Sequence, residues 1–316
     1  MSPLAETVLF VFGLVGLGYL SGVTGYLKPE TGDALSEFAV GVALPLLLFR
    51  TMVDSDFHGS APWALWATYF SAAAVTWAVG HLVTTRVFGR DSIAGVVGGV
   101  SAAFSNLLLL GVPFMLGVFG QDGFEILSLI ITVHLPAMIM VSIILFGIFG
   151  RGDGEPVGPL GVFRAFVRDI ARNPLIVGIL LGLAWRASGL EMSTLASRLV
   201  DALAGIAGPV ALFAMGLGLR KFGISGNLRP ALALSVLKLM LMPALTLGMA
   251  ILFDLPPLVA TVAVVAAGLP AGVNSYLIAT RFGTGQALAS NQMTISTACS
   301  VVTTAFWLMV AQAVFG

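Results

Sequence analysis

The residues with the clearest chemical potential are helix breakers and amides that interrupt long apolar stretches. Six residues share this property: Asn106, Gly111 and Pro113 in one stretch, and Pro270, Gly272 and Asn274 in another. A proline frees the backbone carbonyl about one turn earlier, the start of each half-helix carries a positive dipole end, and asparagine adds amide donors. These groups suit a carboxylate, so we predict that the six residues bind an anionic substrate where two broken helices cross.

The two interrupted stretches occur at matching positions of a duplicated pattern. Asn106 follows Pro45 by 61 residues, and Pro270 follows Pro209 by the same 61 residues. Pro45 and Pro209 also share the pattern Pro-x-x-x-Phe. Broken apolar segments at corresponding positions of two halves indicate the binding site of a transporter. Pro45 and Pro209 either shape that site as hinge or scaffold positions, or simply kink a helix beside an aromatic neighbour.

Three basic residues are candidates for charge or coupling. Lys238 lies inside an apolar stretch, where a central lysine costs about 2.5–3.5 kcal/mol. It either meets a substrate carboxylate or a coupling proton, or it snorkels to the interface and holds helix ends. His134 either relays protons or bonds to a neighbouring helix as a neutral side chain. Arg50 either attracts anions to an outer vestibule or snorkels to the surface.

The composition is that of a helical membrane protein. The chain is 58% hydrophobic and 9% charged, whereas a soluble domain is about 25% charged. A span needs roughly 20 mostly apolar residues. Ten stretches qualify: 4–22, 34–53, 62–85, 93–119, 124–149, 170–188, 197–219, 229–253, 257–280 and 287–314. We therefore predict an all-α polytopic membrane protein with ten transmembrane helices, of which the fourth and ninth are broken.

The central segment divides these spans into five and five. It is rich in charge, glycine and proline, and it separates a first repeat at 1–150 from a second at 170–316, with a cytoplasmic loop at 151–169. An odd number of spans per repeat places the two halves in opposite orientations, so the repeats are predicted to be inverted.

The basic residues of the short loops predict the orientation of the chain. With the N-terminus outside, the inner loops hold 11 Lys and Arg residues, and the outer side holds Arg50, Arg186 and Arg198. Because Lys and Arg concentrate on the cytoplasmic side, both termini are predicted to lie outside the plasma (inner) membrane and the central loop inside.

The sequence contains no recognised catalytic motif. His-Glu-x-x-His, Gly-x-Ser-x-Gly and the Walker loop are all missing, so we predict no enzymatic activity, no cofactor and no metal site. The formal net charge of zero indicates no nucleic-acid partner. Without a nucleotide loop, transport is predicted to be secondary, driven by an ion gradient or by the gradient of the substrate.

These residues together resemble the auxin efflux carrier family, which includes plant PIN proteins and bacterial carriers labelled malonate or dicarboxylate transporters. The resemblance covers nearly the whole chain. The matching features are Ala43-Leu-Pro45, Asn106 with Gly111-Val-Pro113, Arg172-Asn-Pro-Leu-Ile176, Lys238 with Pro243, and Pro270 with Asn274. The central loop is far shorter than the regulatory loop of the plant proteins.

The resemblance implies a fold like that of bile-acid sodium symporters. A scaffold would consist of spans 1, 2, 6 and 7, and a transport domain of spans 3–5 and 8–10. An organic anion would bind at the crossover through Asn106, Pro113, Pro270 and Asn274, and an elevator-like slide would carry it across. The small and apolar residues of the scaffold are compatible with a homodimer. A bacterial relative fits small organic acids better than auxin.

Two alternatives to a carrier of small carboxylates remain open from the sequence. The first is a sodium-coupled carrier of larger amphipathic anions. Sodium would need oxygen ligands, which Asn291, Gln292, Thr294 and Ser296 offer, but no intramembrane acid lies near them. The sequence therefore favours a coupling proton or anion exchange. A receptor or channel fits least, because the chain has neither a signalling domain nor a repeated polar stripe.

Overall fold

The structure is a computed structural model, and it describes residues 3–54, 62–149, 164, 167–168, 171–219, 226 and 228–316. The described chain is built from helices, as the sequence predicted. Nearly all of the predicted cytoplasmic loop at 151–169 lies outside the described residues, so that loop stays a prediction.

Six helical stretches of the described chain are long and apolar enough to cross a membrane. They are Glu6–Val23, Glu30–Asp54, Leu107–Phe149, Thr194–Leu219, Leu228–Leu252 and Gln286–Phe315. This confirms the predicted all-α polytopic membrane protein. The count of ten spans and the inversion of the repeats stay predictions.

The chain forms two compact units, each made of separate parts of the sequence. Unit 1 comprises Met1–Ala61, Leu108–Thr132 and Arg164–Lys221, and unit 2 comprises Pro62–Leu107, Val133–Phe163 and Phe222–Gly316. The long helix α6 (Val112–Phe149) contributes to both units. Gly120 interrupts α6 with φ 64° and ψ −151°, a conformation that glycine adopts without steric cost.

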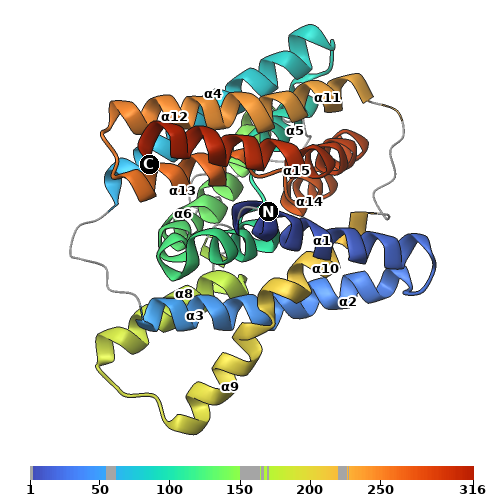
Figure 1. The fold of residues 1–316 in the computed structure, drawn as a ribbon. Helices are drawn as coiled ribbons and strands as arrows, with labels where there is room; N and C mark the ends of the chain where they lie inside the picture. Colours follow the sequence, from blue (N-terminus) through green and yellow to red (C-terminus); the bar gives the residue numbers. More distant parts are fainter. Residues whose placement is uncertain are drawn as a thin grey trace. The chain divides into compact units, whose positions relative to one another are not determined.

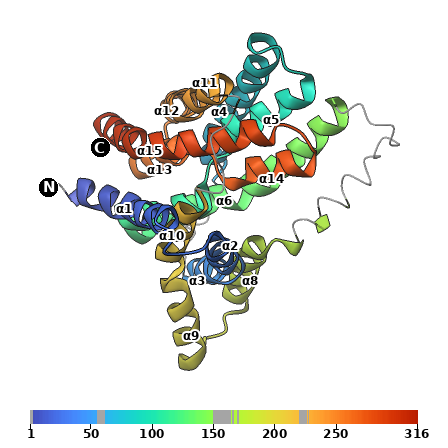
Figure 2. The same cartoon turned by 90° about the vertical axis from the view of Figure 1, so that its right-hand side faces the viewer.

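Unit 1 contains two closely packed helix pairs (Figures 1 and 2). Its helical elements besides the first part of α6 are α1 (Pro3–Val23), α2 (Pro29–Phe38), the π-helical turn η1 (Ala39–Ala43), α3 (Leu44–Asp54), α8 (Pro174–Ser188), α9 (Thr194–Gly205) and α10 (Ala207–Leu219). Helix α1 packs on α10, and α3 packs on α8.

Glycines set the close approach in both pairs of unit 1. A Cβ on Gly178 or Gly182 of α8 would collide with the backbone of α3, and a Cβ on Gly18 or Gly216 would collide with the backbone across the α1–α10 contact. Gly178 and Gly182 form a Gly-x-x-x-Gly pattern, which lets membrane helices pack backbone to backbone. The side chain of Asn173 caps the start of α8 by accepting from the N–H of Leu175 at 3.0 Å.

Unit 2 surrounds two short half-helices with longer helices. Besides residues 133–149 of α6, its elements are α4 (Trp63–Leu82), η2 (Val83–Val87), α5 (Ser92–Ala103), α11 (Leu228–Val236), η4 (Leu237–Leu241), α12 (Met242–Leu252), α13 (Pro257–Gly268), α14 (Val273–Arg281) and α15 (Gln286–Phe315). The turn η3 (Leu107–Gly111) continues from unit 2 into unit 1. Helix α5 packs on α4, and α13 packs on both α12 and α15 (Figure 1).

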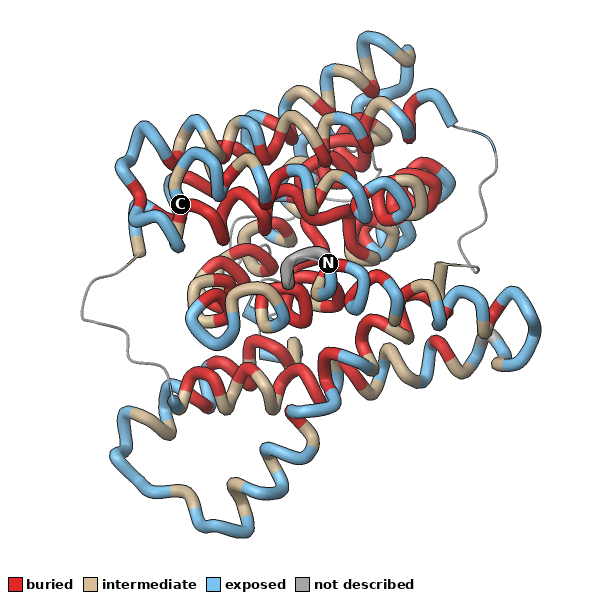
Figure 3. Tube along the Cα trace, viewed as in Figure 1, coloured by how far each residue is buried: buried red, intermediate tan, exposed pale blue. Residues whose placement is uncertain are grey.

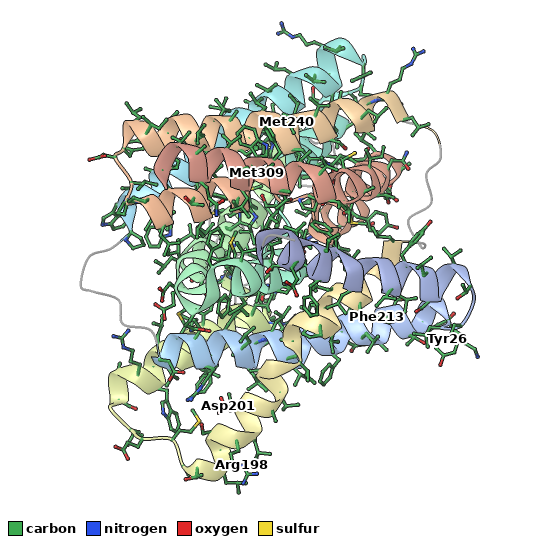
Figure 4. The ribbon with its side chains drawn as sticks, viewed as in Figure 1. Tyr26, Arg198, Asp201, Phe213, Met240 and Met309 are labelled. Carbon is green, nitrogen blue, oxygen red and sulfur yellow. The ribbon has the colours of Figure 1, made fainter. Side chains whose placement is uncertain are left out.

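The half-helices α5 and α13 are buried after their first three residues, whereas the outer helices show one buried and one exposed face. Buried and exposed residues alternate along α1 and α15 (Figure 3). Many of the exposed positions are apolar, for example Leu17 on α1 and Met309 on α15, the second of which is labelled in Figure 4. An apolar surface on a long helix suits contact with lipid.

Prolines explain where the long helices become irregular. Pro45 and Pro209 each stand in the first turn of a helix that follows an irregular turn, η1 before α3 and Ile206 before α10. Pro243 follows η4, and it cannot donate to the carbonyl of Leu239 four residues earlier. Trp307 of α15 donates its indole N–H to that carbonyl at 2.7 Å. A side chain thus satisfies the acceptor that the proline leaves open.

Candidate functional site

The first break lies between α5 and η3 in unit 2. Helix α5 ends at Ala103, Phe104 is extended with φ −84° and ψ 100°, and helical structure resumes at Leu107. The second break lies between α13 and α14. Leu269 is extended with φ −65° and ψ 150°, and α14 begins after Gly272, with φ −92° and ψ 172°.

The breaks are shorter than the sequence suggested. We expected Gly111, Pro113 and Asn274 to interrupt their helices, but Gly111 ends the turn η3, Pro113 stands in the first turn of α6, and Asn274 is the second residue of α14. Pro113 is the second residue after η3, as Pro243 is after η4, so it removes one backbone donor without interrupting the run of helical residues.

The two breaks are hydrogen-bonded to each other. Ser105 and Ala271 form an isolated antiparallel bridge. The N–H of Asn106 donates to the carbonyl of Pro270 at 2.8 Å, and the N–H of Gly272 donates to the carbonyl of Phe104 at 3.4 Å. Backbone groups that have left a helix must find partners where water is excluded. Each break supplies the partners of the other, so the crossing predicted from the sequence is present in unit 2.

Gly272 makes this close approach sterically feasible. A Cβ on Gly272 would lie 3.3 Å from both Cα and Cβ of Asn106, which is tighter than ordinary van der Waals contact. The backbone conformation of Gly272 is extended, so the requirement for glycine here comes from space and not from φ. The structure therefore brings Asn106, Pro270 and Gly272 together, with Asn274 in the first turn of α14.

Two side chains that the sequence did not mark as crossover residues support the breaks. The hydroxyl of Tyr69 on α4 donates to Oγ of Ser105 at 3.0 Å. The N–H of Ala271 donates to Oγ of Ser296 on α15 at 3.2 Å. The sequence offers Ser296 only as a candidate sodium ligand. Neither contact could be read from the local sequence, because Tyr69 and Ser296 come from helices distant in the chain.

Lys238 lies at the end of the half-helix α13. It is fully buried in η4, and its Nζ donates to the carbonyl of Ala267, in the last turn of α13, and contacts Sδ of Met242 at 3.3 Å. The C-terminal end of a helix carries a partial negative charge that favours a cation. The ammonium thus faces the helix end that leads into the second break.

His134 lies beside the first break. Its ring contacts Phe104 with centroids 4.8 Å apart and Tyr69 with centroids 5.5 Å apart. It is buried, and neither ring nitrogen has a hydrogen-bonding partner of good geometry within the described residues, although the Ser105 backbone is a polar neighbour.

The other predicted site residues belong to unit 1. Pro113 packs near Gly208, where a Cβ would lie 3.2 Å from the Cβ of Pro113. Pro209 follows directly in α10, and Pro45 is buried in α3. Because Gly111 and Pro113 belong to unit 1, the site built by unit 2 does not include them, and their role in substrate binding stays a prediction.

Arg50 is held by two carboxylates of unit 1. Its Nε lies 3.1 Å from Asp54 of the same helix and 3.0 Å from Asp201 of α9. Asp201 is labelled in Figure 4. The three side chains are about a third to a half exposed, so the pairs add little to stability. The two pairs do fix the direction of the Arg50 guanidinium. An anion attracted by Arg50 would have to bind it in this orientation.

The residues considered for sodium on α15 are mostly engaged. Asn291 donates to the carbonyl of Gly226 at 2.7 Å, Thr294 donates to the carbonyl of Ser290 at 3.1 Å, and Ser296 binds the Ala271 N–H. The amide of Gln292 is buried and has no partner within the described residues. Sodium coupling stays the alternative prediction.

Comparison with known proteins decides the class of this chain. Residues 3–308 match the family described as "Membrane transport protein". The chain belongs to this family.

Relatives of this transporter are found in bacteria, archaea and animals. It is 30% identical to a Rhizobium meliloti protein named "Putative malonate transporter", over 96% of this chain and 94% of the relative. It is 27% identical to an "Uncharacterized transporter" of Methanothermobacter thermautotrophicus, over 96% and 97%. It is also 27% identical to the mouse "Lysosomal cholesterol signaling protein", over 69% of this chain but 26% of that protein.

Proposed function

We propose that this chain is a secondary carrier of small organic anions, and that it binds a carboxylate beside the two paired breaks of unit 2. The observation that carries the proposal is the backbone pairing of Phe104–Asn106 with Pro270–Gly272, with Asn106 packed on Gly272 and Asn274 at the start of α14. No side chain caps the start of α14 in the described structure, and the first N–H groups of a helix favour an anion.

Charge in unit 2 also suits an anion. Lys238 is fully buried, and the contacts found for its Nζ within the described residues are the carbonyl of Ala267 and Sδ of Met242. A buried ammonium beside the crossover raises the local potential, which attracts negative charge. The name of the Rhizobium relative supports a short carboxylate such as malonate as the first substrate to test.

The mechanism in this proposal is an elevator-type alternating access. Spans 1, 2, 6 and 7 would act as the scaffold and spans 3–5 and 8–10 as the transport domain. Units 1 and 2 follow this division except at residues 108–132, which belong to unit 1. The carrier would work in the plasma (inner) membrane with both termini outside, coupled to protons or to anion exchange, either as a monomer or as a homodimer.

Uptake into proteoliposomes tests the proposal. Radiolabelled malonate, malate, lactate and indole acetate would be offered with and without proton and sodium gradients. We expect carboxylate uptake by the wild type and its loss in the Asn106→Ala, Asn274→Ala double variant. Gln312→Ala, which removes an amide from an exposed position of α15, serves as the control. If the double variant takes up as much carboxylate as the wild type, the crossover is not the substrate-binding site.

A second candidate is a carrier of larger amphipathic anions. An apolar groove of about 570 Å³ runs between α4 and residues 137–149 of α6, with Phe70, Trp77, Met138 and Phe149 among its lining residues. Its size falls within the roughly 300–1,000 Å³ typical of pockets for drug-sized ligands. Sodium-driven uptake of long-chain acids, with no uptake of malonate or lactate, would favour this second function.

A further inference from the structure

The apolar groove of unit 2 follows two helices for about the thickness of one membrane leaflet. Its lining extends from Phe70 to Leu82 on α4 and from Ala137 to Phe149 on α6. Each stretch advances by twelve residues, which is about 18 Å at 1.5 Å per residue. Half of the roughly 30 Å hydrocarbon core of a bilayer is about 15 Å. The groove therefore has the length of a lipid chain that reaches from the membrane surface to the midplane.

Ring contacts hold the two helices together at both ends of the groove. Phe70 stacks on His134 of α6, with centroids 6.4 Å apart and planes inclined by 27°. His81 lies against Phe149, with centroids 5.1 Å apart. The start of the lining stretch of α4 thus meets the start of that of α6, and the two ends meet as well. The helices run in the same direction, and the groove lies along both.

Small side chains open the groove toward the surface of unit 2. Ala74 and Ala78 of α4 line it, and both are exposed. None of the six predicted crossover residues is among the described residues that line it. Both stretches belong to predicted spans, where lipid is the solvent that covers an exposed apolar surface. An occupant of the groove would therefore meet lipid on its open side, and it would not contact the breaks.

The polarity of the groove changes in one direction along its length. His81, in the last turn of α4, is the one titratable side chain among the described lining residues. Arg86 follows Leu82 by four residues, about one turn, and is exposed on η2. A phospholipid has the same order of groups, from an apolar chain through polar esters to a charged phosphate. Arginine binds phosphate through two parallel hydrogen bonds.

The predicted orientation places Arg86 at the cytoplasmic surface. Span 62–85 leads into an inner loop that also holds Arg90, and basic residues concentrate on this side. Anionic lipids make the cytoplasmic surface of a membrane negative, and they attract basic residues that lie near it. An anionic phospholipid of this leaflet matches both the apolar length of the groove and the cation beyond its end.

The volume of the groove excludes a helix as its full occupant. An α-helix with its side chains is about 10–12 Å across, so 18 Å of helix fills about 1,400 Å³ or more. The groove measures about 570 Å³. A single hydrocarbon chain is much narrower than a helix and can follow the groove from end to end.

We propose that the groove binds one acyl chain of an anionic phospholipid from the cytoplasmic leaflet, with Arg86 at the phosphate. The lipid is a resident partner of unit 2 and is not transported. This occupant differs from the transported long-chain acid of the second candidate function. The inference does not depend on the proposed carriage of small anions, because neither the crossover nor the substrate enters the argument.

The test measures lipid binding to the purified full-length protein in detergent by native mass spectrometry. Dioleoyl phosphatidylglycerol and dioleoyl phosphatidylcholine are titrated separately, because they share their acyl chains and differ in net charge. Ala78→Phe fills the groove. Ala67→Phe is its matched control, since Ala67 is an exposed alanine of α4 that does not line the groove. Arg86→Gln removes the cation, and Arg229→Gln, at the exposed start of α11, is its control.

We expect the wild type to bind phosphatidylglycerol roughly fivefold more tightly than phosphatidylcholine, the ratio expected for one basic residue near a membrane surface. Ala78→Phe should lose roughly tenfold or more in affinity for both lipids, because its ring occupies the space of the chain. Arg86→Gln should bind phosphatidylcholine within about twofold of the wild type and lose the preference for phosphatidylglycerol. Both control variants should bind the two lipids as the wild type does.

Three outcomes overturn the inference. Equal binding of the two lipids by the wild type removes the anionic headgroup, and undiminished binding by folded Ala78→Phe removes the groove. Uptake of oleate into proteoliposomes that Ala78→Phe abolishes would make the occupant a cargo. Size-exclusion profiles verify folding. Should Ala78→Phe not fold, Ala78→Leu takes its place, and the lipid preferences of the wild type and Arg86→Gln still decide. A wild type that takes up no carboxylate removes the proposed function and leaves this inference intact.

Discussion

The two breaks of unit 2 share one backbone arrangement but differ in the side chains around them. The first break, at Phe104–Asn106, has a neutral and aromatic environment: Tyr69 donates to Ser105, and the ring of His134 packs on Phe104. The second break, at Leu269–Gly272, has a cation and a hydroxyl: Lys238 binds the end of α13, and Ser296 binds the N–H of Ala271.

This difference shows that two breaks with the same backbone arrangement can have side chains of different chemistry around them. The mutual hydrogen bonds between the breaks fix their shape in both halves. Among the described contacts of the two breaks, the charged side chain is Lys238, which comes from the second half. We therefore expect substitutions near the second break to affect anion transport more than substitutions near the first.

The largest expected effect comes from Lys238→Met. Loss of a buried, hydrogen-bonded charge should lower carboxylate uptake roughly a hundredfold. The fold should survive, because replacing a buried charge with an apolar side chain of similar length is often tolerated. Uptake assays and thermal melts in detergent measure the two effects.

Met242→Leu is the control for Lys238→Met, since it conserves volume at a contact of Lys238 while leaving the ammonium and its bond to Ala267 in place. Wild-type uptake by Lys238→Met would show that the charge at the second break serves the structure alone.

Gly272→Val should break the pairing that the two halves share. Its side chain would press on Asn106, and we expect a loss of about 1–3 kcal/mol in stability together with weaker uptake. Gly248→Ala on α12 is the control, because nothing lies within 4 Å of a Cβ placed there. Equal melting temperatures of Gly272→Val and the wild type would contradict the close approach.

His134→Phe tests whether the first break takes part in coupling. Phenylalanine keeps the packing on Phe104 and Tyr69 but removes both ring nitrogens. If His134 carries the coupling proton, an imposed pH gradient should no longer stimulate uptake by the variant, while uptake driven by the substrate gradient continues. Stimulation equal to that of the wild type would assign the coupling to another group.

The smallest effects should come from the two hydroxyls. Ser296→Ala leaves the buried N–H of Ala271 without its partner, which costs about 1–3 kcal/mol. Tyr69→Phe removes the hydroxyl that donates to Oγ of Ser105, which should cost about 1 kcal/mol. Thermal melts of both single variants measure the order, and a larger loss for Tyr69→Phe would reverse the ranking of the two breaks.

The sequence was informative about where the helices break. Proline, glycine and asparagine in apolar runs predicted the interruptions near Asn106 and Pro270, and the structure has breaks at both places. It was less accurate about their extent, since Gly111, Pro113 and Asn274 all lie in helical turns. Residues that are compatible with a break are also compatible with the first turn of the next helix.

By itself, the sequence determined that this chain is an all-helical membrane protein with two interrupted segments, because apolar run length and helix-breaking residues are local properties. Only the tertiary structure decided what meets those segments: Tyr69, Ser296 and Lys238 come from three other helices. Such contacts depend on how distant helices pack, and in an apolar protein many helix faces look equally suitable in the sequence.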